Sequence, residues 1–359
     1  ADRTVPGNSM AQRVAALVGP ETGQLRSGAV ERVDDLTVRL SLEAPDATLI
    51  AGLADYPALV VHRGFDAAAG IGPDTVGTGP YLIENLTPGT SATLVRREGW
   101  WGGAVALERI AYLDLGTDPS EFVFGFETGL IDMVYESTGI YVDLLDGMGL
   151  ERSAVLSGAT LVARGNRDAA PELYGDARVR RAMALAVDNT VVLELGYAGL
   201  GLPAQNHHVG PMHPDHASIS APDPDPSQAL SLLREAGAAE AEHELRAIDD
   251  DWIRASTDAI IAQLRDAGFR IKRTLMDGAS FWEGWREHPF SCTQWNMRPL
   301  GVQNMALAYA SGSAWNETGF SEPEFDAALV QALAEPDPEA RQPHMATMER
   351  ALLADGTII

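Results

Sequence analysis

A chain of 359 residues is too long to fold around one ordinary hydrophobic core, and its apolar share of 45% is enough to build two lobes. The net charge of −25 excludes nucleic acid and anionic lipid as partners, because both require a basic protein face. Cys292 is the only cysteine, which excludes an intrachain disulfide and a metal site built from cysteines.

The first part of the chain predicts short elements separated by turns. In chain order we expect a helix over 10–18, two strands within 30–42, a helix over 47–54, a strand over 110–115, a helix over 121–129 and a strand over 131–135. The strand–helix–strand order at 110–135 predicts a parallel strand pair in an α/β layer.

A second lobe is predicted to begin near Leu156. Its expected strands lie at 160–163, 244–248, 269–275 and 290–297, and its expected helices at 176–188, 226–236, 257–267, 280–287, 322–334 and 337–355. Residues 202–226 are rich in proline, histidine and aspartate and predict a long loop. No apolar run approaches the roughly 20 residues that a membrane-spanning helix needs.

The most informative motif is Gly-Thr-Gly-Pro-Tyr at 77–81, followed after a strand by Arg-Arg-Glu-Gly-Trp-Trp-Gly-Gly at 96–103. Three further segments follow it in order: 127–132, the arginine-rich helix at 176–188, and 315–326. Together these segments resemble the signatures of the extracellular solute-binding proteins, family 5, which serve peptide, dipeptide and nickel ABC importers.

The resemblance implies an α/β, two-lobed periplasmic-binding-protein-like fold (type II, cluster C), with mixed sheets flanked by helices and a ligand cleft between the lobes. We expect the first lobe over 1–155 and the second over 156–359. The family also has an N-terminal block before the strands at 30–42 and a C-terminal return into the first lobe. Both are expected to be absent here, so that these residues are a fragment.

The best local candidate for ligand contact is Trp295-Asn296-Met297-Arg298, where a predicted strand runs into a loop. In dipeptide-binding relatives the matching segment carries an aspartate for the ligand's amino terminus, but 294–301 contains no acid. Arginine suits a carboxylate instead, so Arg298 is expected either to bind a ligand carboxylate or to form a structural ion pair.

A second candidate is the aromatic and amide pair Trp315-Asn316, which forms a pocket wall or packs in the core. Tyr135 ends a predicted strand near the hinge that the resemblance implies, and it is a third candidate. Trp282 and Trp285 lie three residues apart on one helical face, which favours the core.

The loop at 202–226 holds four histidines, His207, His208, His213 and His216. Clustered histidines suit Zn²⁺ or Ni²⁺, but no pair has the i,i+4 spacing that a helix would fix. We therefore predict no metal, and expect Asn206, His207 and His208 to line the ligand site or the contact between lobes.

The predicted function is that of the solute-binding component of an ABC importer, which captures a small peptide-like solute and delivers it to a membrane permease. The protein is expected to be an exported, periplasmic or otherwise extracytoplasmic monomer, with or without a lipid anchor. It is expected to have no cofactor, catalytic residue or nucleic-acid partner. Two alternatives stay open: a carrier of metal or metallophore, and a two-lobed hydrolase with paired carboxylates, although no common catalytic motif is present.

Overall fold

The computed structural model describes residues 13–19, 21–55, 58, 60–116, 118–137 and 141–359. By their packing, the described residues divide into two compact units. The larger unit comprises residues up to 57 and from 138 onward, and the smaller unit comprises 58–137. The division into lobes over 1–155 and 156–359 stays a prediction.

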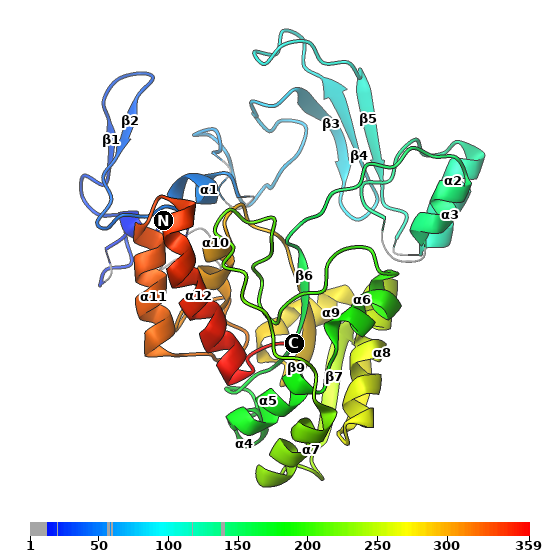
Figure 1. Cartoon of the computed structure of the whole chain (residues 1–359). Coiled ribbons are helices and arrows are strands. Elements are labelled where there is room, and N and C mark those ends of the chain that lie inside the picture. The colour runs from blue at the N-terminus through cyan, green and yellow to red at the C-terminus, as the bar shows by residue number, and fades with distance from the viewer. Residues whose placement is uncertain (1–12, 20, 56–57, 59, 117, 138–140) are drawn as a thin grey trace. The chain divides into compact units, whose positions relative to one another are not determined.

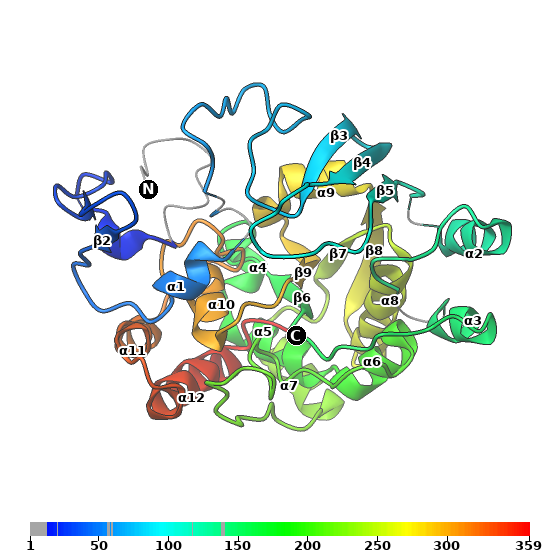
Figure 2. The ribbon, with the colours of Figure 1, turned by 90° about the horizontal axis from the view of Figure 1, so that it is seen from above.

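The larger unit is built on a mixed sheet of four strands in the order β6-β9-β7-β8 (Figure 1). Its strands are β6 (Thr160–Gly165), β7 (Glu242–Ile248), β8 (Arg270–Met276) and β9 (Phe290–Trp295). β6 pairs with β9 antiparallel, whereas β7 pairs with both β8 and β9 parallel. Ile359 pairs with Ala163 on the outer edge of β6, and the C-terminus lies beside β6 in both views (Figure 2).

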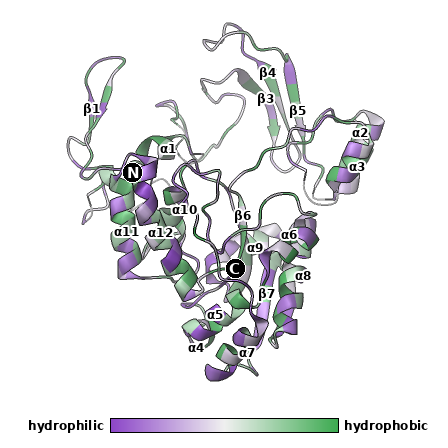
Figure 3. Ribbon diagram, viewed as in Figure 1, coloured by the Kyte–Doolittle hydropathy of each residue, from purple (hydrophilic) through white to green (hydrophobic). Residues whose placement is uncertain are grey.

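Helices cover this sheet and form two hydrophobic cores with it, and a third, smaller core gathers Val14, Leu17, Val18, Ala29 and Leu49. The helices of this unit are α1 (Leu49–Leu53), α3 (Tyr141–Gly147), α4 (Pro171–Tyr174), α5 (Ala177–Leu185), α6 (Asn189–Tyr197), α7 (Pro226–Glu235), α8 (Asp251–Asp266), α9 (Gly278–Glu283), α10 (Gly301–Ala308), α11 (Pro323–Ala334) and α12 (Pro338–Asp355), with 3-10 turns η1 (Ala15–Leu17) and η3 (Trp285–Glu287). One core lies between the sheet and α5, α7 and α8, and the other gathers α10, α11 and α12. Figure 3 shows apolar and polar residues alternating along these helices, as expected where one face packs on a core.

The two strands expected within 30–42 form a small antiparallel hairpin, β1 (Val30–Arg32) and β2 (Val38–Leu40). The predicted helix at 10–18 is wrong over 13–18, where the structure has the 3-10 turn η1; the rest of that prediction lies outside the described residues. Four helices were missed by sequence reasoning: α3, α4, α6 and α10.

The smaller unit contains the antiparallel sheet β3 (Tyr81–Thr87), β4 (Ser91–Arg96) and β5 (Arg109–Leu113), followed by helix α2 (Pro119–Thr128). Its glycine-rich motif at 77–81 is held by side chains from the second motif. The Arg97 guanidinium donates to the carbonyls of Gly77 and Gly79 at 2.9 and 2.8 Å, and the indoles of Trp100 and Trp101 both donate to the Thr78 carbonyl. The two motifs therefore form one turn, stabilised through backbone oxygens.

The predicted strand at 131–135 and its parallel pairing are wrong. No strand follows α2 among residues 129–137, and both strand pairs among the described residues of the smaller unit are antiparallel. The amides of Leu130 and Ile131 both donate to the Gly125 carbonyl, which wraps the chain back onto the end of the helix. Apolar residues at 130–135 suggested a strand, but Leu130, Met133 and Tyr135 are exposed.

A buried ion pair crosses the centre of the larger unit. The Arg164 guanidinium on β6 lies 3.0 Å from the Glu317 carboxylate, and neither side chain is more than 3% exposed. Arg164 also donates to the carbonyls of Trp285 and His288, at 2.6 and 2.8 Å. Further hydrogen bonds stabilise both buried ions, although Nε of Arg164 has no hydrogen-bond partner among the described residues.

The long loop between α6 and α7 is confirmed, and it is anchored by buried polar contacts. Asp215 is fully buried and accepts hydrogen bonds from the amides of Gly301 and Val302 at the start of α10. The same carboxylate lies 3.1 Å from Arg341 on α12. Glu349, also on α12 and fully buried, lies 3.9 Å from His207 of the loop, and burial raises the pKa of its carboxyl to about 8.

Replacing Arg164 with methionine is expected to lower the free energy of unfolding by about 3–5 kcal/mol, because the variant leaves the Glu317 carboxylate buried without its counter-ion. Arg270→Met breaks the exposed pair with Glu240 and is the matched control, for which a much smaller loss is expected. Chemical denaturation measures both variants. Equal losses would show that the buried pair has no special role.

Glu349→Gln is expected to flatten the dependence of stability on pH. The folded state raises the pKa of Glu349 from 4.5 to about 8, so the stability that this group contributes is complete below pH 4.5 and is lost as pH rises through 8. Across that window the wild type loses up to about 1.4 kcal/mol per pH unit from this one group, and the variant does not. Denaturation curves at several pH values, with exposed Glu283→Gln as control, test this; parallel profiles for wild type and Glu349→Gln would contradict it.

Candidate functional site

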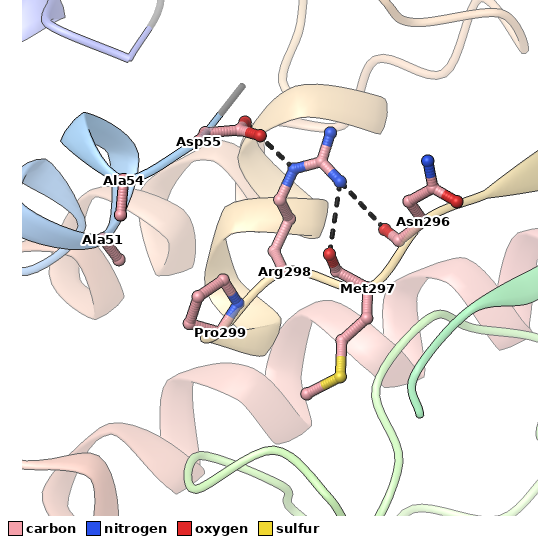
Figure 4. Close-up of a pocket in the computed structure, with 7 residues that line it drawn as sticks. All are labelled: Ala51, Ala54, Asp55, Asn296, Met297, Arg298 and Pro299. Carbon is pink, nitrogen blue, oxygen red and sulfur yellow. Dashed lines mark hydrogen bonds and ion pairs between the residues drawn. The ribbon is translucent and has the colours of Figure 1, made fainter. Parts of the chain in front are cut away.

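A pocket of about 300 Å³ lies in the larger unit, where the end of β9 faces helix α1 (Figure 4). One wall comes from α1 and the residues directly after it, and the other comes from the turn that follows β9. The lining residues are Ala51, Ala54, Asp55, Asn296, Met297, Arg298 and Pro299. Three of the four residues of the predicted segment 295–298 thus line one pocket.

The turn after β9 is held by its own arginine. Nη1 of Arg298 donates to the carbonyl oxygens of Asn296 and Met297, at 3.0 and 3.3 Å. Pro299 has no amide hydrogen and restricts the residue before it, so the strand cannot continue. Helix α10 then begins at Gly301.

An ion pair joins the two walls of the pocket. Nε of Arg298 lies 3.2 Å from Oδ2 of Asp55, and Nε of Arg13 donates to the same oxygen at 2.6 Å. Arg298 and Arg13 are each only 6% exposed. Arg298 therefore does form the structural ion pair that the sequence allowed, and this pair is part of the pocket itself.

Polar groups of the pocket remain available for a solute. Nη2 of Arg298 makes no hydrogen bond to any residue that the structure describes, and Figure 4 shows it pointing away from the turn. The exposed side-chain amide of Asn296 likewise has no hydrogen-bond partner among the described side chains and backbone groups. A guanidinium N–H and an amide N–H that line the same pocket can both donate to the oxygens of an anion.

Trp295 lies behind the pocket rather than in it. It is 4% exposed, and its indole nitrogen donates to Oε1 of Glu317 at 2.7 Å. Trp315 packs edge-on against Trp295, with ring centroids 6.0 Å apart, and the Arg13 guanidinium lies over the Trp315 ring at 5.1 Å. Sequence reasoning missed Glu317, although an acid between Trp315-Asn316 and the apolar Phe320 was a usable signal.

The two asparagines of the prediction have local partners. The Asn316 amide donates to the Phe320 carbonyl at 2.7 Å and accepts from Thr318, which closes the turn at 316–320. Asn206 has a left-handed backbone, with φ of 58°, and its side chain accepts from Asn189 at 2.8 Å. Their contact with a ligand stays a prediction, as does that of Trp295 and Trp315.

The histidines of the long loop point to different partners. His207 Nε2 lies 2.9 Å from the Ile219 carbonyl, and His208 Nε2 lies 2.8 Å from the Tyr309 hydroxyl. Burial lowers the pKa of His208 to about 3, so this ring is neutral at physiological pH. Within the described part of the chain, no group of three histidine, cysteine or acidic residues could hold a metal ion. The loop therefore offers no ready ligand set for the metal-carrier alternative.

Tyr135 belongs to the smaller unit and is 90% exposed. The other predicted site residues belong to the larger unit, so the role of Tyr135 at the ligand site stays a prediction. Among the helices of the described residues, none is long and apolar enough to cross a membrane.

Comparison with known proteins finds one family model and several relatives that match the chain. The model of the bacterial extracellular solute-binding proteins, family 5 (middle region), matches residues 7–317. Glutathione-binding protein GsiB of Pectobacterium atrosepticum is 23% identical over 87% of the chain and 63% of its own length. Dipeptide-binding protein DppE of Bacillus subtilis is 23% identical over 91% and 63%. Heme-binding protein A of Haemophilus influenzae is 28% identical over 58% and 39%.

Solved structures share the fold. The murein tripeptide binding protein MppA of Escherichia coli superposes with a TM-score of 0.85 at 17% identity, covering 99% of this chain and 74% of its own. The periplasmic binding protein DppA of Helicobacter pylori, in complex with the peptide STSA, gives 0.84 at 16%, covering 99% and 71%. The predicted class, the α/β fold of two-lobed periplasmic binding proteins with mixed sheets and flanking helices, is confirmed.

The chain spans 39 to 63% of the length of the three curated relatives named above. The family model, in contrast, covers most of the chain, and its match runs through both the glycine-rich turn and the strand that ends at the pocket. The chain therefore belongs to the bacterial extracellular solute-binding proteins, family 5.

Proposed function

We propose that this protein is the solute-binding component of an ABC importer, which captures a peptide-like solute with a free carboxylate outside the cytoplasm and delivers it to a membrane permease. Family membership supports the binding role, and nothing in the site calls for a chemical step on the solute. The carboxylate is bound at the pocket between α1 and the end of β9.

The proposal that the solute has a carboxylate rests on one observation. The pocket contains an arginine whose Nε and Nη1 are held by Asp55 and by the turn, while Nη2 carries no hydrogen bond within the described residues. The guanidinium is thus fixed in place before a solute arrives, so little side-chain entropy is lost on binding. Asn296 adds a second donor beside it, and two donors suit the two oxygens of a carboxylate.

The relatives favour the same class of solute. Among them are proteins named for binding dipeptides and glutathione, and a solved complex with a tetrapeptide. All of these solutes end in a carboxylate. The heme-binding relative widens the range of solutes in the family, but heme also carries carboxylates.

A tryptic digest of casein, offered before and after amidation of its C-termini, tests the choice of solute. Native mass spectrometry is expected to detect retained peptides from the free-acid digest and few from the amidated one, because amidation removes the negative charge that Arg298 would pair. Equal retention of both digests would contradict a carboxylate site. Retention of neither would contradict the peptide-binding role.

Asn296→Ala is expected to raise the Kd of a retained free-acid peptide about ten- to a hundredfold, since one hydrogen bond to a charged group is lost. The side-chain amide of Asn296 has no hydrogen bond within the described protein, and the substitution keeps the backbone carbonyl that Arg298 binds, so the free energy of unfolding should not change. Exposed Gln331→Ala on α11 is the matched control. Calorimetric titration measures Kd; an unchanged value for Asn296→Ala would remove this residue from the site.

A further inference from the structure

We propose that Glu317 is a positioning residue of the pocket. It does not line the pocket, but it fixes the end of β9 so that the donors of Asn296 and Arg298 face the solute. This inference rests on the proposed function, because it concerns how the same pocket selects a carboxylate.

Both oxygens of the Glu317 carboxylate are occupied by other parts of the chain. Oε1 accepts from the indole of Trp295 at 2.7 Å, and Oε2 accepts from the Thr293 hydroxyl at 2.8 Å and lies 3.0 Å from Arg164. Glu317 is 2% exposed, so these contacts form where water does not compete. Trp295 is the last residue of β9, and Asn296 follows it directly. The position of the first pocket residue on this wall therefore depends on the contact between Trp295 and Glu317.

Hydrogen bonds tie the residues after Trp295 to one another. Arg298 binds the carbonyls of Asn296 and Met297, so its guanidinium is tied to the backbone on which both donors stand. A shift at Trp295 would therefore carry the donors of Asn296 and Arg298 together, away from their arrangement opposite α1. A displacement of this kind alters which groups of a solute the pocket can bind, although every side chain of the pocket is still present.

The segment that carries Glu317 also reaches the other wall. The ring centroids of Trp315 and Trp295 are 6.0 Å apart, and the Arg13 guanidinium carbon lies 5.1 Å from the Trp315 ring centroid. Arg13 in turn donates to Asp55, the pocket residue that pairs with Arg298. Residues 315–317 thus contact Trp295 and Arg13, one residue for each wall, and Glu317 fixes this segment to the sheet through its ion pair with Arg164.

Substitutions at Thr293 and Trp295, which lie two residues apart on β9 and both donate to Glu317, distinguish a positioning role from a general effect on stability. Trp295→Phe removes the hydrogen bond to Oε1 of Glu317 and keeps most of the ring packing, whereas Thr293→Val removes a hydrogen bond to Oε2 from the same strand. Both variants are titrated with the free-acid and amidated casein digests, and thermal unfolding is measured on both. The readout is the preference for free acid over amide, which a general loss of stability would not change.

Trp295→Phe is expected to lower this preference about tenfold, and Thr293→Val to leave it within about twofold of the wild type. An undiminished preference in Trp295→Phe, or an equal decrease in both variants, would overturn the positioning role while leaving the carboxylate site intact. A wild type without any preference would instead refute the proposed function on which the inference rests.

Glu317→Gln provides a second test if Trp295→Phe does not fold. The amide oxygen can face Arg164 or Trp295, but not both, so the variant is expected to lower the same preference by about the same factor as Trp295→Phe. A folded Glu317→Gln protein with full preference for the free acid would overturn the inference.

Discussion

The structure of the larger unit depends on one buried carboxylate. Glu317 meets Arg164 from β6 and two residues of β9, and it is only 2% exposed. A buried charge must be paired and hydrogen-bonded, so the loop at 315–320 can occupy only the position that completes these contacts. The last residue of β9 is fixed by the same requirement, and the pocket begins at the next residue.

Ion pairs also hold the two walls of the pocket together. Asp55 receives Arg13 and Arg298, which joins α1 to the turn after β9 although the two segments are more than two hundred residues apart in the sequence. Arg298, the arginine that joins the two walls, is also the group that we propose binds the carboxylate of a solute. In this proposal Arg298 has both a structural and a binding role, and a carboxylate from a solute would meet a guanidinium already held in place.

Sequence reasoning reached most of the strands and helices of the larger unit because their apolar periodicity is clear, as in β7, β8 and α8. It missed α10, whose residues are almost all buried and show no polar face. It wrongly predicted a strand at 131–135, where hydrogen bonds from the amides of Leu130 and Ile131 to the Gly125 carbonyl turn the chain back onto the end of α2. Asn296, Met297 and Arg298 were identified as pocket candidates, but Asp55 and Glu317 were not, because their contacts join distant parts of the chain.

A crystal structure of the protein with a free-acid peptide would test the carboxylate site most directly. We expect the C-terminal carboxylate of the peptide to lie within hydrogen-bond distance of Nη2 of Arg298 and of the Asn296 amide, with the ion pair between Arg298 and Asp55 still formed. A peptide bound with its carboxylate elsewhere, or with its amino terminus at Asp55 in place of Arg298, would contradict this expectation.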